Sequence, residues 1–223
     1  DLDRLIEQPA GVIAHVEHQA RQLPPRLFLH RHQRRLAVPR QPLDHHPPGV
    51  HRWPADRAIA DFGFVDILVN NAGRFLPRPL LQTTEEEFDA ILALNAKGPY
   101  FAMQAAAQVL SDGGRIVNIS SALTHLKFPG ATAHVGSKAA LEQYGKGLAQ
   151  ELAPRGITVN TVLPGFTDTG VLTEPYRRMG AQMSPTQRLG QPSDIADVVA
   201  FLVSEQARWL TGQVIHAGGG LVM

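Results

Sequence analysis

Short apolar runs alternate with longer amphipathic segments in the part of the chain that follows residue 61. Residues 65–69, 115–119, 157–163 and 214–217 form short runs rich in β-branched side chains, with turn residues beside each run. Runs of this length, rich in valine and isoleucine, are typical of strands that are buried on both faces of a parallel sheet. The pattern therefore predicts four strands, with 65–69 and 157–163 buried in the sheet.

The segments between these runs have the apolar spacing of helices. Thr83 or Thr84 precedes three glutamates, which predicts a helix start because hydroxyl caps and acidic groups stabilise the positive end of the helix dipole. The helical pattern continues to Leu110, and we expect a disturbance at Gly98 and Pro99. This segment is the first of the predicted crossover helices.

Two more helices follow in the second half of the chain. One is predicted over residues 132–153, where Pro154 and Gly156 end it, and another begins with Ser193 or Asp194 as its cap. Residues 166–191 between them are polar and predict a long loop with at most a short helix, of a length typical of a functional lid.

Strands that alternate with helices at these intervals predict an α/β fold, a Rossmann-type doubly wound parallel sheet in three layers. Ligands of such sheets bind at the carboxyl ends of the strands. Residues 70–73, 120–121 and 164–165 all follow predicted strands and fall at those ends. The sequence therefore predicts one ligand site at this edge of the sheet.

Composition places the chain among ordinary globular proteins. Of its 223 residues 43% are hydrophobic and 18% charged, which suits one sizeable domain. It has no cysteine, so thiolate chemistry and disulfides are excluded, and no apolar run has the length of a signal peptide or a membrane span. The net charge of +1 gives no reason to expect a nucleic-acid or membrane partner. We expect a cytoplasmic protein.

The first sixty residues differ from the rest. They hold seven of the ten histidines, many prolines and arginines, and no lysine, and the prolines leave no room for a long helix or central strand over residues 24–48. We therefore divide the chain into an atypical segment, 1–60, and a Rossmann-type domain, 61–223. The first βαβ unit of the sheet is expected to be missing or disrupted.

Four interpretations of the atypical segment stay open. The basic run 30–40 could contact phosphates, although it lacks interleaved aromatic residues, and its paired histidines could bind a metal, although they lack partners at ligand spacing. The segment could also be an irregular tail without chemistry. The fourth interpretation is a GC-rich coding sequence that is translated in the wrong frame.

The stretch 115–141 carries the strongest candidate chemistry. A strand ends in two serines, a loop follows, and a helix then presents a basic residue. This order can bring Ser121, His134 and Lys138 around one small volume, an arrangement that suits proton transfer to or from an oxygen.

Five short motifs occur in a fixed order along the chain: NNAG at 70–73, Asn95 followed by Gly98, NISS at 118–121, a lysine at Lys138, and PGxxxT at 164–169. In these motifs, with Lys138 as the lysine of YxxxK, residues 62–223 resemble the short-chain dehydrogenase/reductase family. The resemblance implies a homotetrameric or dimeric Rossmann-type oxidoreductase that uses NAD or NADP to interconvert an alcohol and a carbonyl.

The same resemblance implies roles for single residues. Ser121 would hold the substrate oxygen, Lys138 would bind ribose hydroxyls and tune the acid, and Asn95 would anchor a relay water. The residue at the position of the family's acid is His134. The cofactor would be bound by Asn70, Ala72, Gly73, Lys138, Pro164, Gly165, Thr167 and Thr169. No metal is implied.

Two departures from the family pattern lower the expected activity. His134 replaces the family tyrosine, and because an imidazole is shorter than a phenol, proton transfer would suffer from misplacement. The Gly-rich turn TGxxxGxG that approaches the pyrophosphate is also missing. The alternative function is therefore a catalytically inactive homologue, a pseudoenzyme that acts through binding or oligomerisation, in which His134 is an ordinary helix-start residue.

Overall fold

The computed structural model describes residues 36–37, 64–170 and 172–222. Within these ranges five parallel strands form one sheet in the order β1-β2-β3-β4-β5. The strands are β1 (Leu36–Ala37), β2 (Val65–Asn70), β3 (Leu110–Ile119), β4 (Thr158–Pro164) and β5 (Val214–Ala217). The four predicted strands are confirmed as β2 to β5, and the parallel α/β sheet is confirmed with them.

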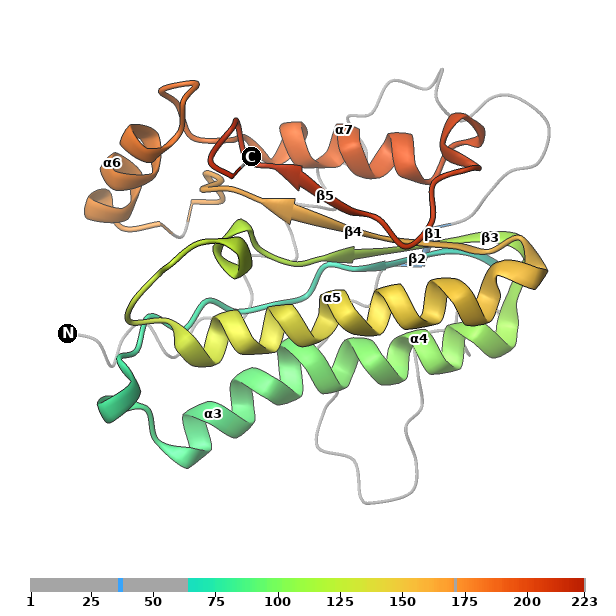
Figure 1. The fold of residues 1–223 in the computed structure, drawn as a ribbon, viewed down its shortest axis with the longest axis horizontal. Helices are drawn as coiled ribbons and strands as arrows, with labels where there is room; N and C mark the ends of the chain where they lie inside the picture. The colour runs from blue at the N-terminus through green and yellow to red at the C-terminus, as the bar shows by residue number, and fades with distance from the viewer. Residues whose placement is uncertain (1–35, 38–63, 171, 223) are drawn as a thin grey trace.

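Helices cover both faces of the sheet, which confirms the predicted three layers (Figure 1). The α-helices are α3 (Glu85–Leu92), α4 (Gly98–Val109), α5 (Thr132–Leu152), α6 (Glu174–Met183) and α7 (Pro192–Leu202). Figure 1 shows α3, α4 and α5 on one face, α7 on the other, and α6 beyond the carboxyl ends of β4 and β5. The short helices are η3 (Leu80–Gln82), η4 (Ala93–Lys97), η5 (Ala122–His125), η6 (Ala153–Arg155) and η7 (Glu205–Ala207).

The core lies in two layers because neighbouring residues of a strand point to opposite faces. Leu68 packs with Ala106 and Leu141 on the side of α4 and α5. Its neighbour Val69 packs with Leu202 on the side of α7. Across the described ranges, no helix combines the length and the apolar character that spanning a bilayer would need.

The disturbance predicted at Gly98 and Pro99 occurs one turn earlier than expected. Residues 93–97 form the π-helical turn η4, in which the Gly98 N–H donates to the carbonyl of Ala93, five residues back. Pro99 lies in the first turn of α4. Proline has no N–H to donate and its ring crowds the carbonyl four residues back, so a wider turn before Pro99 accommodates it.

The start of the last helix was predicted two residues too late. Gln191 is the N-cap of α7 and Pro192 is its first residue, since the fixed φ of proline suits that position. Asp194, predicted as a cap, instead lies inside the first turn, and its carboxylate accepts the Gln191 N–H at 2.7 Å.

Two further boundaries differ from the prediction. β3 begins at Leu110 rather than at 115, because the strand continues through a register shift opposite residues 65–67 of β2. The two-residue strand β1 pairs with β2 within the stretch 24–48, where the prolines excluded only a long central strand. The rest of the atypical segment, and the first βαβ unit with it, lies outside the described residues.

Candidate functional site

The loop that follows β2 is the centre of the candidate site. The Arg74 N–H donates to Asn95 Oδ1 at 2.9 Å, and Asn95 Nδ2 donates to the Arg74 carbonyl at 3.0 Å and to Ser137 Oγ at 3.0 Å. Asn95 is fully buried, at 0% exposure, in the π-helical turn. Its carboxamide therefore fixes the main chain of this loop. The role expected for Asn95 as the anchor of a relay water stays a prediction.

His134 lies in the first turn of α5 against the same loop. Its Nδ1 is 3.0 Å from the Arg74 carbonyl oxygen, which can only accept, so Nδ1 carries the proton of that hydrogen bond. The imidazole is 5% exposed and packs edge-on against the ring of Phe75, with centroids 5.0 Å apart. Burial, together with the charge of Lys138, lowers the pKa of His134 to about 4. At neutral pH His134 is therefore uncharged, with its lone pair on Nε2.

Lys138 lies one turn further along α5 and is also buried, at 5% exposure. Its Nζ donates to the Ile119 carbonyl at the end of β3, at 2.7 Å. Burial lowers the pKa of the Lys138 amine to about 8, and the charge of Glu142 opposes that shift. A Cβ on Gly73 would lie 2.8 Å from this Nζ, so the amine packs directly against the main chain of Gly73.

The two serines at the end of β3 have different surroundings. Ser121 is half-buried and caps η5, where its Oγ accepts the Leu123 N–H at 3.3 Å. Ser120 is buried, and its Oγ donates to Glu142 Oε1 at 2.6 Å. Ser121 follows Ile119 by two residues, so it lies at the same end of β3 as the amine of Lys138.

Asn70 ends β2 and is tied to the neighbouring strand. Its Nδ2 donates to Asn118 Oδ1 at 2.8 Å, and both side chains are buried. This contact holds the carboxyl ends of β2 and β3 together. Ala72 and Gly73 follow in the half-buried loop. The cofactor-binding roles expected for these three residues stay predictions.

The segment after β4 supplies the opposite side of the site. The Gly165 N–H donates to the Ala217 carbonyl at 3.3 Å, and a Cβ on Gly165 would lie 2.7 Å from Gly218 Cα. Thr167 Oγ1 donates to the Gly165 carbonyl at 3.1 Å, and the Thr169 N–H donates to the Thr167 carbonyl. Pro164 is the last residue of β4. These residues form a tight turn at the carboxyl edge of the sheet.

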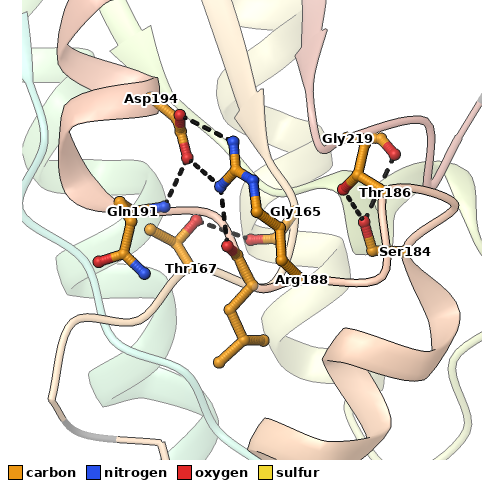
Figure 2. A network of polar contacts seen from close by, with 9 residues as sticks. Gly165, Thr167, Ser184, Thr186, Arg188, Gln191, Asp194 and Gly219 are labelled. Carbon is orange, nitrogen blue, oxygen red and sulfur yellow. Dashed lines mark hydrogen bonds and ion pairs between the residues drawn. The ribbon is translucent and has the colours of Figure 1, made fainter.

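Polar contacts fasten the long segment 166–190 to α7. Figure 2 shows the Arg188 guanidinium reaching Asp194, with Nη1 2.6 Å from Oδ2 and Nη2 3.1 Å from Oδ1. In the same view Ser184 Oγ lies 2.8 Å from Thr186 Oγ1. Residues 165–167, 184–190 and 217–221 line a cavity of about 190 Å³.

Aromatic rings gather around His134 from four segments of the chain. The Phe75 ring centroid lies 5.9 Å from that of Tyr176 in α6 and 6.4 Å from that of Phe128. Phe128 in turn packs against Phe166 at 6.3 Å. Of these rings Phe75 contacts the imidazole, and the other three extend the cluster from it.

Sequence reasoning did not identify Glu142, His125 or Phe75. Glu142 is 3% exposed, and its Oε2 lies 3.2 Å from His125 Nε2. Its spacing of four residues from Lys138 places both on one face of a helix, and this signal could have found it. His125 is the last residue of the short helix η5 and Phe75 lies in the loop after β2, and neither has such periodicity. Among the described residues, no group of three or more His, Cys, Asp or Glu is arranged to hold a metal.

The residues at the carboxyl edge fit part of a dinucleotide. The Lys138 amine lies against Gly73, and the turn at Gly165 lies against Gly218 and beside the cavity of about 190 Å³. A Gly-rich turn for the pyrophosphate is absent from the sequence. The described residues could therefore hold the nicotinamide with its ribose and line one side of the adenosine.

Comparisons with known proteins agree with this architecture. A family profile described as "Enoyl-(Acyl carrier protein) reductase" matches residues 52–222. An uncharacterized oxidoreductase of Methylorubrum extorquens is 42% identical over 176 residues, which are 76% of this chain and 71% of that protein. The 3-oxoacyl-[acyl-carrier-protein] reductase FabG of Staphylococcus aureus is 41% identical over 170 residues, 74% of this chain and 69% of that protein.

Solved structures show the same likeness. The angucycline C-6 ketoreductase LanV with bound NADP superposes with a TM-score of 0.72 at 44% identity, covering 74% of this chain and 66% of that one. A blue fluorescent protein from a metagenomic library, in complex with NADPH, gives a TM-score of 0.72 at 38% identity, covering 75% of this chain and 68% of that one. This chain thus spans about two thirds of their length. With the motifs and the parallel sheet, these matches show that the chain belongs to the short-chain dehydrogenase/reductase family of oxidoreductases.

Proposed function

We propose that the protein is an NAD(P)-dependent oxidoreductase that interconverts an alcohol and a carbonyl. The observation that carries the proposal is the buried amine of Lys138, held by the Ile119 carbonyl beside Gly73 at the carboxyl edge of the sheet. Relatives whose names describe carbonyl reductases, and similar structures with NADP or NADPH, support it. The substrate oxygen would lie at Ser121, which is half-buried at the end of β3.

When bound, the nicotinamide supplies or accepts the hydride. Lys138 would donate to the ribose hydroxyls, and Asn70, Ala72 and Gly73 would line the adenosine side. The turn formed by Pro164, Gly165, Thr167 and Thr169 would hold the carboxamide. Asn95 would keep Arg74 in place and, through it, His134.

The protonation state of His134 limits proton transfer in both directions. Its proton is on Nδ1, toward the Arg74 carbonyl, so Nε2 offers a lone pair at neutral pH. This lone pair would accept the proton of an alcohol during oxidation, and the imidazolium so formed would return it to the carbonyl oxygen during reduction. Because a group with a pKa of about 4 is a weak base, we expect turnover in both directions to be lower than in a chain with tyrosine at this position.

The proposal is tested first by binding and then by turnover. Fluorescence titration with NADH and NADPH should show saturable binding by the natural chain. Lys138→Met should weaken this binding, and the exposed Lys146→Met on the same helix provides the matched control. Failure of the natural chain to bind either dinucleotide would refute the proposed function.

Turnover of a secondary alcohol and of its ketone should then be compared in the natural chain and in His134→Tyr. A phenol in this position should raise the rate of ketone reduction by about 100-fold. Because the equilibrium constant is fixed, kcat/KM for alcohol oxidation should rise by the same factor. No gain in either direction would contradict the assignment of His134 to the proton-transfer position. Binding without turnover in both chains would favour the second function below.

The second candidate is a non-catalytic member that acts through oligomerisation. Tyr100 and Tyr144 pack edge-on, with centroids 5.1 Å apart, and stay 44% and 37% exposed on the outer side of α4 and α5. Beside them Leu92, Ala96 and Ala140 line an open groove. This apolar face supports a homo-oligomer, a dimer or tetramer. Tyr144→Glu should convert it to a monomer in sedimentation velocity, and an unchanged mass would exclude this face.

A further inference from the structure

Glu142 is a buried carboxylate that the proposed chemistry does not use. It lies on α5 at 3% exposure, and a carboxylate in such surroundings needs partners for both oxygens. Oε1 accepts from Ser120 Oγ at 2.6 Å, and Oε2 lies 3.2 Å from His125 Nε2. Both partners belong to the segment that leads from β3 into the site.

Glu142 and Lys138 attach the same face of α5 to consecutive residues of one strand end. Lys138 Nζ donates to the Ile119 carbonyl, and Glu142 accepts from the next residue, Ser120. Ser120 Oγ also lies 3.2 Å from the main-chain carbonyl of Lys138. Lys138 and Glu142, opposite charges one helical turn apart, are therefore both buried where α5 meets residues 119 and 120, a contact that we call the seam.

The groups that face this seam come from three elements. His134 precedes Lys138 by one turn on α5 and is uncharged at neutral pH. His125 contacts Glu142 from η5, and the ring of His216 on β5 lies 4.7 Å from the ring of His125. Burial and the neighbouring His125 lower the pKa of His216. Glu142 follows Lys138 by one turn of the same helix. The negative charge of Glu142 and the uncharged imidazole therefore lie on opposite sides of Lys138 along the helix.

We propose that Glu142 is a positioning residue of the candidate site, whose buried carboxylate keeps Lys138 as an ammonium ion at the end of β3. The proposal rests on the proposed function, because the ammonium form is the one that donates to ribose hydroxyls. Burial alone favours the neutral amine, whereas a carboxylate one helical turn away in the same buried surroundings favours the charged form. Without Glu142, Lys138 would lose its proton within the physiological pH range.

The test measures the charge state of Lys138 directly. The four lysines of the sequence can be labelled with 13C at Cε, and Lys138→Met assigns the signal of interest. In the natural chain without dinucleotide, this signal should titrate with a pKa of about 8. Glu142→Gln, which keeps the shape and removes the charge, should lower that pKa by roughly one unit.

Two matched variants separate charge from structure. Ser120→Ala removes the hydrogen bond at 2.6 Å and leaves the carboxylate, so the pKa of Lys138 should stay within roughly 0.3 units of the natural chain. Glu151→Gln makes the same substitution at an exposed position of α5 and should also leave it unchanged. The proposal is overturned if Glu142→Gln shifts the pKa by less than about 0.3 units, or if Ser120→Ala shifts it equally.

A second variant tests the proposal if Glu142→Gln does not fold. His125→Arg places a permanent positive charge beside Glu142 Oε2 at a position that is 40% exposed, where a longer side chain can reach solvent. The added charge offsets the field of Glu142, so the pKa of Lys138 should fall by roughly half a unit. An unchanged value would refute the electrostatic link.

Measurements of dinucleotide binding distinguish a failure of this proposal from a failure of the proposed function. All lysine titrations are made without dinucleotide, so they stay informative if the natural chain binds neither NADH nor NADPH. If it does bind, Glu142→Gln should shift the pH at which affinity falls by the same amount as the pKa of Lys138. Equal pH profiles for both chains would contradict the proposal, while saturable binding would still support the proposed function.

Discussion

The titratable side chains on the α5 side of the candidate site and those on the α6 side differ in burial and in the direction of their pKa shifts. On α5, His134 and Lys138 are buried, and their pKa values move toward the uncharged forms. On the other side Asp168 pairs with Arg177 of α6 at 2.6 Å, and this arginine lowers the pKa of the carboxyl. Asp194 likewise has its pKa lowered by Arg188.

The difference has a common physical cause. Burial removes water from His134 and Lys138, so the charged forms lose solvation that the protein replaces only in part. The ion pairs near α6 stay in water, which keeps their charges stable but makes each contact weak. On the α5 side the surroundings can therefore shift the pKa values of the side chains. The α6 side is held by ion pairs that are individually weak.

The largest effect should come from the pH dependence of His134. Its folded pKa of about 4 lies below the ordinary histidine value, so the unfolded chain binds more protons between pH 4 and 6.5. Stability should therefore fall as the pH drops through this window, by about 3 kcal/mol from this group. Denaturant titrations of the natural chain and His134→Gln should diverge with pH by this amount. Parallel curves would contradict the assignment.

Asn95→Ala should cost about 2 kcal/mol of unfolding free energy, because it leaves the Arg74 main chain and Ser137 without their partner. Urea denaturation measures this loss. Lys97→Ala, an exposed position of the same turn, should change stability by less than about 0.5 kcal/mol. Similar losses in both variants would mean that the turn itself, not the carboxamide, is responsible.

Substitutions of the adjacent serines should affect different properties, with Ser120 important for stability and Ser121 for activity. Ser120→Ala removes a hydrogen bond to a buried carboxylate and should cost about 1.5 kcal/mol. Ser121→Ala should change stability by only about 0.5 kcal/mol, whereas under the proposed function it should lower turnover roughly 100-fold. Denaturation and steady-state rates measure the two effects. The reverse pattern would assign the substrate oxygen to Ser120.

The smallest effect on stability should come from the exposed side. Asp168→Asn weakens the pair with Arg177, and we expect little change in the denaturation midpoint because both side chains are partly exposed and solvent screens the pair. Cleavage by trypsin at Arg177 and Arg178 should nevertheless become faster. High salt should accelerate cleavage of the natural chain in the same way. A large loss of stability would show that this side is fixed as firmly as α5.

The sequence predicted well those features that depend on local pattern. Residues 65–69 were found as a strand because burial on both faces requires continuous apolar side chains. Residues 214–217 were found from their β-branched residues and the glycines that follow, although none of the four is buried. Lys138 was found through its motif, and the structure places its amine at the end of β3. The start of α7 was missed because Pro192 and Gln191 compete with Ser193 as helix-start signals.

The features that escaped prediction depend on contacts between distant segments. Phe75 packs against His134 across 59 positions of the chain, and no periodicity marks such a pair. The π-helical turn depends on Pro99 and also on the contacts of Asn95 with Arg74 and Ser137. Glu142 was within reach of pattern reasoning, but its importance appears only when the burial of both charges is known.

The π-helical turn at Ala93–Lys97 also constrains how the chain can change in length. The wider turn accommodates one residue more than an α-helical turn between α3 and α4. Deleting one residue from it would restore a regular helix and shift Asn95 relative to its partners. The loop after β2 would then lose the contacts of Asn95. Among relatives of this protein, gaps should therefore fall outside this turn, even where its side chains vary.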